Sequence, residues 1–123
     1  MYAIVHVHGV TPDLDVLADD TRRVLLTLLT VEGELCVCEL EAATDELQPI
    51  VSRQLAILRE AGWVRGQRSG RRMYYDIAAI PEWARMILRG FSEGGVPRAT
   101  LRRMRARLSR FEGRPPRRSR GAA

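Results

Sequence analysis

Hydrophobic residues recur at helical spacing over the first part of the chain and predict three helices. The first occupies residues 12–18, with Thr11 as its cap and Pro12 at its first position. The second is capped by Asp20 and ended by Gly33, and the third is a short helix over residues 37–44. Apolar side chains three or four residues apart form one face of a helix, so these helices are expected to share a core.

A fourth helix is predicted over residues 48–62, after a tight turn at residues 45–48. Pro49 lies in its first turn, where a missing N–H does no harm, and Gly62 is expected to cap its end. One side of this helix is an apolar stripe and the other is polar. The stripe consists of Leu47, Val51, Leu55 and Leu58, and the opposite side offers Gln48, Ser52, Arg53, Ala56 and Arg59.

Beyond the fourth helix the apolar pattern changes from helical to alternating. It predicts two strands, residues 63–67 and 71–77, joined by a tight turn at Ser69–Gly70. Helical spacing returns after Pro81 and lasts to Gly94–Gly95. The apolar face of this fifth helix is broad and consists of Trp83, Ala84, Ile87, Leu88 and Phe91.

A last helix is expected over residues 98–111, with arginines over most of its polar face. From Gly113 onward the chain is a low-complexity basic tail, which is expected to be disordered. The chain is therefore predicted to be mainly α with a small β-hairpin (α+β). Its parts are an N-terminal arm (1–10), one domain (11–95) and an Arg-rich C-terminal extension (96–123).

Charge is distributed unevenly along the 123 residues. Residues 1–50 carry two arginines and ten acidic residues, a net charge of −8, whereas residues 51–123 carry 18 arginines and five acidic residues, a net charge of +13. The basic residues are all arginines, whose planar guanidinium binds phosphates and guanine edges with two hydrogen bonds at once. The basic C-terminal part therefore predicts a polyanionic partner.

Neither a membrane protein nor an exported one is expected. No apolar run approaches the roughly 20 residues of a membrane span, and residues 1–10 lack the basic flank and cleavage site of a signal peptide. We expect a cytoplasmic protein, in which thiols stay reduced. Its two cysteines, Cys36 and Cys38, are then expected to be ligands or reactive thiols and not a structural disulfide.

Two short helices joined by a tight turn and followed by a basic hairpin are the pattern of a winged helix-turn-helix. The major groove admits one helix, whose side chains near the N-terminus must be short or forked to reach base edges. Ser52, Arg53 and Gln54 are therefore predicted to contact bases of a double-stranded operator. Contacts with phosphate or the minor groove are predicted for Gln48, Arg68, Arg71 and Arg72.

Cys36 and Cys38 lie at the start of the third predicted helix. Side chains two residues apart point about 200° from each other in an ideal helix, so they converge on one ion only if the helix start is loosened. Binding of a thiophilic ion is therefore expected to unwind the first turn and to move the recognition helix. In a protein that binds DNA as a dimer, the half-site spacing of about 34–36 Å would then be lost. Thiolates select soft species such as As(III), Sb(III), Cd, Pb or Cu(I).

Four segments resemble, in the same order, the ArsR–SmtB family, and most closely its arsenical-resistance operon repressors. The resemblance covers about residues 13–92 and implies a winged-helix homodimer. Such a dimer binds a palindromic operator and releases it when a metal or metalloid binds. The segments are residues 17–22 (LADDTR), 34–40 (ELCVCEL), 48–55 (QPIVSRQL) and 80–84 (IPEWA).

The resemblance implies that As(III) or Sb(III) is the inducer, bound by Cys36 and Cys38, with no organic cofactor. These repressors often carry a third cysteine where this chain has Glu41, a hard and therefore poor substitute for a thiolate. The third position is left open: it is empty, filled by a small thiol or hydroxide, or supplied from elsewhere. One such source is His6 and His8 of the partner's arm.

The homodimer interface is expected to form from helices 12–18 and 82–92. Its anchors are predicted to be Trp83, Ile87 and Phe91, which lie on the apolar face of the fifth helix.

Other functions stay open at this point. A redox- or persulfide-responsive repressor would use the reactivity of thiols at a helix start, although a disulfide between Cys36 and Cys38 is expected to be strained. A Cd/Pb-responsive repressor would have the same fold, but the cysteines that such sensors add from the N-terminal arm are missing here. An enzyme is not expected, because no partner histidine, arginine cradle or Gly-rich phosphate loop accompanies the thiols.

The Arg-rich extension allows one further function. Residues 98–120 hold ten arginines and one acidic residue, so a non-specific nucleic-acid binder is possible by charge alone. The alternative that we favour is a helix 98–111 that packs on the dimer with its arginines in water.

Overall fold

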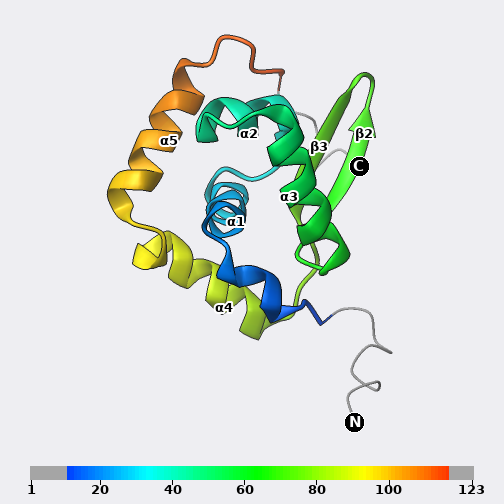
Figure 1. Cartoon of the computed structure of the whole chain (residues 1–123), viewed down its shortest axis with the longest axis vertical. Coiled ribbons are helices and arrows are strands. Elements are labelled where there is room, and N and C mark those ends of the chain that lie inside the picture. The colour runs from blue at the N-terminus through cyan, green and yellow to red at the C-terminus, as the bar shows by residue number, and fades with distance from the viewer. Residues whose placement is uncertain (1–10, 117–123) are drawn as a thin grey trace.

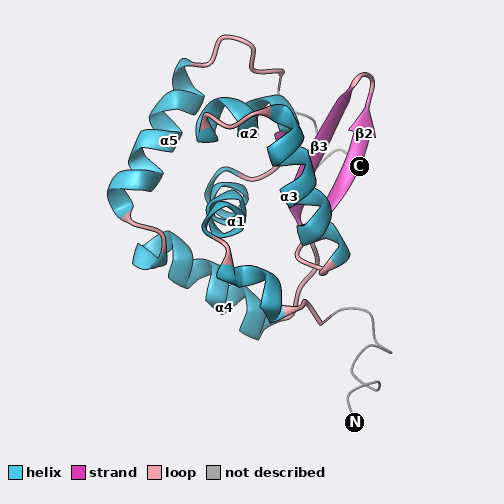
Figure 2. Cartoon of the chain, viewed as in Figure 1, coloured by secondary structure: helices cyan, strands magenta, loops and turns pink. Residues whose placement is uncertain are grey.

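The computed structural model describes residues 11–116, which form a group of helices with a small antiparallel sheet at one edge (Figures 1 and 2). Helices α2 and α3 with the hairpin β2–β3 are a winged helix-turn-helix, as predicted. In chain order the elements are η2 (Leu14–Ala18), α1 (Asp20–Glu32), β1 (Leu35–Cys36), α2 (Val37–Thr44), α3 (Gln48–Glu60), β2 (Val64–Ser69), β3 (Arg72–Ile77), α4 (Glu82–Gly90), η3 (Phe91–Gly95) and α5 (Arg98–Arg110).

Helix α1 lies at the centre, surrounded by α2, α3, α4 and α5 (Figure 1). Five consecutive residues of α1, from Leu25 to Leu29, are buried, so this helix is covered on all sides and not along one stripe only. Thr27, the one polar residue among them, donates its hydroxyl to the carbonyl of Arg23 at 2.7 Å. Replacing a fully buried leucine here by alanine is expected to cost about 2–5 kcal/mol of stability.

The start of the described chain differs from the prediction. Residues 14–18 form a 3-10 helix capped by Asp13, whose side chain accepts the N–H of Asp15 at 2.9 Å; Thr11 is not the cap. The reason is tertiary. The backbone of Asp13 is fixed to the end of α3, because its N–H donates to the carbonyl of Ala61 at 2.8 Å and its carbonyl accepts the indole N–H of Trp63 at 2.7 Å.

Helix α1 also begins one residue earlier than the predicted cap implies. Asp19 is the cap and accepts the N–H of Arg22 at 3.0 Å, whereas Asp20 is the first helical residue. The predicted end is confirmed, since Gly33 follows the helix with φ of 83°. Two adjacent aspartates both satisfy the sequence rule for a cap, and only the backbone geometry distinguishes them.

The recognition helix α3 packs along Val51, Leu55 and Leu58, which are fully buried as predicted. Leu47 was expected in the same stripe, but it is 70% exposed. It lies before the helix in extended conformation, so its side chain leaves the helical progression. Gly62 has φ of 89° just after the helix, a conformation that glycine adopts without strain.

The sheet has three strands in the order β1–β3–β2, and β1 was not predicted. Leu35 and Cys36 pair with Tyr75 and Tyr74 of β3. The turn of the hairpin lies at Gly70–Arg71, one residue later than predicted, because Ser69 pairs with Arg72. A strand of two residues has no alternating pattern to read in the sequence.

Helix α5 packs along α2 of its own chain. Leu108 is buried, while Leu101 and Met104 pack against the core. The basic tail was expected to be disordered from Gly113, but Arg114 is held by a carboxylate of α2. Residues 1–10, with His6 and His8, and residues 117–123 lie outside the described residues. No helix within the described part is long and apolar enough to cross a membrane.

Candidate thiol site and nucleic-acid interface

The two cysteine side chains meet without any unwinding of helix α2. Cys36 precedes the helix with φ of −83° and ψ of 162°, and Cys38 is the second helical residue. Their sulfurs are bonded to each other, and their Cα atoms are 5.4 Å apart. The structure therefore corrects two expectations: the thiols are not free, and their convergence does not require a loosened helix. Because Cys36 pairs with Tyr74 of β3, its backbone is extended and not helical. The rotation of about 100° per residue that separates side chains within a helix therefore does not apply between Cys36 and Cys38.

A hollow of about 510 Å³ lies beside the cysteines. Cys36 is buried, whereas Cys38 is partly exposed. The other walls come from the start of α3, the wing and the segment after α5, so residues far apart in sequence surround the thiol site. Several of the side chains predicted to contact DNA line this hollow together with the cysteines: Gln48, Ser52, Arg68, Arg71 and Arg72.

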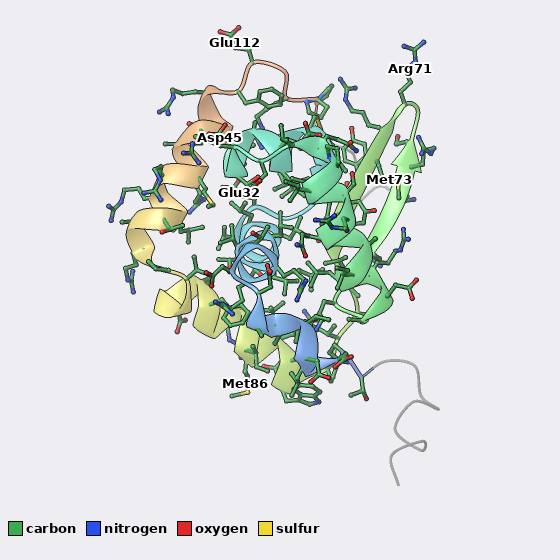
Figure 3. All side chains as sticks on the ribbon, in the orientation of Figure 1. Glu32, Asp45, Arg71, Met73, Met86 and Glu112 are labelled. Carbon is green, nitrogen blue, oxygen red and sulfur yellow. A yellow bond between two sulfur atoms is a disulfide. The ribbon has the colours of Figure 1, made fainter. Side chains whose placement is uncertain are left out.

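The wing side of the hollow is positively charged. Arg68, Arg71 and Arg72 are exposed, and none of them forms an ion pair with a carboxylate of the described residues. Figure 3 shows Arg71 at the tip of the hairpin, where its side chain points away from the helices. Among the described residues that line the hollow, Glu41 is acidic and three are arginines, so the hollow favours an anion.

The polar side of α3 divides into an open part and a part used within the protein. Gln48 and Ser52 face the hollow and share a hydrogen bond of 2.6 Å, and Arg53 is exposed. The side-chain oxygen of Gln54, in contrast, accepts a hydrogen bond from Nη1 of Arg22 at 2.9 Å. Gln54 therefore ties α3 to α1 and stands apart from the other predicted DNA contacts.

Glu39 is a site residue that the sequence analysis missed. Its side chain is buried and bridges two segments: Oε1 accepts the N–H of Cys36 at 2.8 Å, and Oε2 accepts Nε of Arg114 at 2.8 Å. A glutamate three residues after a helix cap is a known capping signal, which would have identified the first of these bonds. No local pattern predicts the second, because Arg114 lies 75 residues further along the chain.

The described residues do not provide a third metal donor beside the thiols. Within residues 11–116, no group of three or more His, Cys, Asp or Glu side chains is arranged to hold a metal ion. Glu41 lines the hollow but does not complete such a group. The chemistry available at this site is therefore that of two sulfurs: reversible disulfide formation, or binding of one soft ion by two thiolates.

The predicted dimer anchors differ in exposure. Trp83 is 42% exposed, whereas Ile87 and Phe91 are partly buried and pack against the core. Met86, which was not predicted, is 58% exposed on the same helix, and Figure 3 shows it pointing away from α4. Together with Leu14 of η2, which is 52% exposed, these side chains leave apolar surface on η2 and α4.

Residues 19–65 match the family model described as "Bacterial regulatory protein, arsR family". These residues are an arsR-family domain. They extend from the cap of α1 to the start of β2 and so include both cysteines and the recognition helix. The resemblance inferred from the four sequence segments is confirmed.

Curated relatives of the arsR-family domain are transcriptional regulators. The "Arsenic resistance transcriptional regulator ArsR1" of Pseudomonas putida is 48% identical over 75 residues, which are 60% of this chain and 59% of that protein. The "Arsenical resistance operon repressor" of Escherichia coli K12 is 45% identical over 74 residues, 59% of this chain and 63% of that protein. The chain thus spans about three-fifths of the length of these relatives. They are regulators and not enzymes, which confirms the expectation for this domain.

Solved structures support the fold of the arsR-family domain. The transcriptional regulator HlyU of Vibrio vulnificus is 28% identical, with a TM-score of 0.58 over 65% of this chain and 80% of that one. HlyU of Vibrio cholerae is 22% identical, with a TM-score of 0.60 over 76% of this chain and 96% of that one, and so shows likeness of fold alone.

Proposed function

We propose that this protein is a transcriptional repressor that binds operator DNA and is released when As(III) or Sb(III) binds Cys36 and Cys38. The observation that carries the proposal is the shared hollow: the thiol pair and the side chains suited to DNA line the same space. The names of the relatives, which are regulators of arsenic or arsenical resistance, support the choice of inducer. A repressor of this kind acts in the cytoplasm, where its DNA is.

DNA recognition is assigned to α3 and the wing. Ser52 and Arg53 are proposed to contact bases in the major groove, while Gln48 and the wing arginines contact phosphate or the minor groove. Arg53→Ala is expected to cost about 1–3 kcal/mol in operator binding if Arg53 makes a forked base contact. Gln54 reaches a base only after its bond with Arg22 opens, so Gln54→Ala is expected to cost less. Equal losses in an electrophoretic titration would contradict this assignment.

The repressor is proposed to be a homodimer, because a palindromic operator is bound by two copies related by a two-fold axis. The exposed apolar side chains on η2 and α4 support this arrangement: Leu14, Trp83 and Met86 are exposed, while Ile87 and Phe91 are partly buried against the core. Trp83→Ala with Met86→Ala is expected to shift the protein toward the monomer in sedimentation equilibrium. An unchanged mass would contradict the interface.

Release of DNA follows from differential affinity. The inducer shifts the equilibrium only if it binds the DNA-free form more tightly than the DNA-bound form. A ligand on Cys38 enters the hollow that Ser52 and Arg72 also line, so the inducer and a DNA strand compete for one space. Two thiolates suit a soft ion, and the third donor is proposed to be a small thiol or hydroxide from solvent, since Glu41 is hard. Counting sulfur neighbours by X-ray absorption distinguishes these donors.

Single cysteine substitutions test the proposed function. Cys36→Ser and Cys38→Ser are expected to bind operator DNA like the reduced wild type, because neither thiol is needed for DNA contact, and to lose the response to arsenite. Glu41→Gln changes another side chain of the same hollow and is the matched control, expected to keep the response. Release of either serine variant by arsenite would refute the site.

The bonded sulfurs favour one second candidate, a redox-responsive repressor. Oxidation of the two thiols by one molecule of peroxide forms one S–S bond and two molecules of water. The structure contains this bond, with the Cα atoms of Cys36 and Cys38 5.4 Å apart. Titrating the reduced protein with arsenite and, separately, with peroxide while following operator binding separates the candidates. If only peroxide releases DNA, the metalloid function is wrong and the redox function stands.

A further inference from the structure

The segment after α5 is connected to the thiol site through one buried carboxylate. Glu39 is 4% exposed, and both of its oxygens are used: Oε1 by the N–H of Cys36 and Oε2 by Nε of Arg114, each at 2.8 Å. Gly113 lines the hollow beside the cysteines. Figure 1 shows this segment passing over α2 after α5 ends. The C-terminal segment is therefore a wall of the thiol site, although it lies outside residues 19–65.

We propose that Glu39 and Arg114 are positioning residues that hold Cys36 in the conformation in which its sulfur meets that of Cys38. The proposal rests on the proposed function in one respect, that the thiol pair is the sensor. It adds the C-terminal segment as a partner of the thiol pair. Docking of this segment on Glu39 favours the approach of the two sulfurs, and their approach favours the docking.

The physical reason lies in the needs of a buried carboxylate. A buried charge is stable only when it is paired and hydrogen-bonded, and Arg114 supplies the pairing. Without Arg114, the carboxylate of Glu39 is stabilised by turning toward water, because hydration then replaces the lost ion pair. It then leaves the N–H of Cys36, whose extended conformation before α2 is what brings the two sulfurs to the same side.

Helix α5 delivers Arg114 to this place by contacts along α2. Leu108 is buried, and Nη1 of Arg107 donates to the carbonyl of Ala43 near the end of α2 at 3.2 Å. Nε of Arg105 bonds Glu32 at the end of α1 at 2.7 Å. These contacts fix α5 before the chain turns at Gly113, so Arg114 reaches Glu39 from an anchored helix.

The test measures how strongly the two thiols of the full chain favour the disulfide in a glutathione redox buffer. Arg114→Gln is expected to lower this equilibrium constant by about three- to ten-fold, the range for losing a charge-assisted bond that is partly screened. Arg114→Lys keeps the charge and is expected to recover part of the loss. Arg110→Gln removes an exposed arginine four residues earlier and is the matched control, expected to equal the wild type.

A second readout follows the N–H of Cys36 directly. In the structure this amide donates to Glu39. Arg114→Gln is therefore expected to speed its hydrogen exchange in the reduced protein by about ten-fold, with Arg110→Gln unchanged. An Arg114→Gln variant with wild-type disulfide equilibrium and wild-type exchange at Cys36 would overturn the proposal. Neither measurement uses a metalloid. Failure of the response to arsenite would therefore leave the positioning role standing, and failure of the positioning role would leave the response to arsenite standing.

Coupling of this kind is reciprocal. Reduction of the disulfide in the wild type is therefore expected to speed amide exchange at residues 112–114 several-fold, and the difference is expected to vanish in Arg114→Gln. Identical exchange of this segment in the oxidised and reduced wild type would also overturn the proposal.

Discussion

The tip of the wing and the C-terminal region, which consists of α5 and the segment after it, are both rich in arginine, yet the fold uses them differently. Arg68, Arg71 and Arg72 on the wing form no ion pair within the described residues. Arg105 and Arg114, in contrast, bond Glu32 and Glu39 of the acidic N-terminal half. The comparison shows that the function of an arginine-rich segment depends on whether the fold brings carboxylates to it, which composition does not reveal.

The difference also explains the uneven charge of the chain. Part of the acidity of residues 1–50 is matched inside the molecule by α5 and the segment after it. The tip of the wing keeps its positive charge because no carboxylate in the described part of the chain pairs with Arg68, Arg71 or Arg72. Positive potential is thereby concentrated near α3, where a polyanion is proposed to bind.

The largest expected effect is the loss of operator affinity when the arginines at the tip of the wing are replaced. Replacing Arg68, Arg71 and Arg72 by alanine together is expected to weaken operator binding by about 100-fold at moderate salt. It should also reduce the magnitude of the slope of log binding constant against log salt concentration by about 2.7, the value for three phosphate contacts. Fluorescence anisotropy over a salt series measures both quantities.

The matched control is a triple alanine variant on the exposed face of α5, at Arg102, Arg103 and Arg110. It removes the same charge, and we expect it to change operator affinity by no more than about three-fold, the effect of screened charge at a distance. If the two triple variants weaken DNA binding equally, the distinction between the regions is wrong.

The next effect concerns stability. Glu39→Ala removes the acceptor of Cys36 N–H and the partner of Arg114, and is expected to lower the free energy of unfolding by about 2 kcal/mol. Glu41→Ala, at a partly exposed position on the same helix, is expected to change it by less than about 0.5 kcal/mol. Urea unfolding of the reduced proteins gives both values, and similar losses would show that the buried carboxylate has no special role.

The smallest effect is expected at Arg105. Its ion pair with Glu32 is half exposed on the arginine side, so Arg105→Ala should lower the free energy of unfolding by less than about 0.5 kcal/mol and leave operator affinity unchanged. Thermal unfolding and anisotropy provide the check. A clear loss of DNA binding in this variant would mean that α5 contacts DNA, as the wing is proposed to do.

Local pattern was sufficient for much of the fold. The helical period of Val51, Leu55 and Leu58 predicted the buried face of α3, and the position of α2 was predicted to the residue. Local pattern was insufficient wherever a residue distant in sequence determines the position or the contacts of a side chain. Leu47 fitted the apolar stripe but lies before the helix, and Gln54 fitted the polar face but is bonded to Arg22.

The candidate site was predictable in its residues but not in its connections. The spacing of Cys36 and Cys38 identified the thiol pair, and helical geometry led to the expectation that the helix must unwind. The two-residue strand β1 made this expectation wrong by placing Cys36 outside the helix. Glu39 has a local signal, the spacing from a helix cap, whereas its bond with Arg114 has none.

The sequence by itself determined the class of the domain, the position of the thiols and the side of α3 that faces outward, because these depend on residue type and on periods of a few residues. Only the tertiary structure decided which arginines remain free for a polyanion and which are bound by buried or half-buried carboxylates. Those pairings join residues about 75 positions apart. Their free energies depend on burial and geometry that packing creates, and no local pattern encodes them.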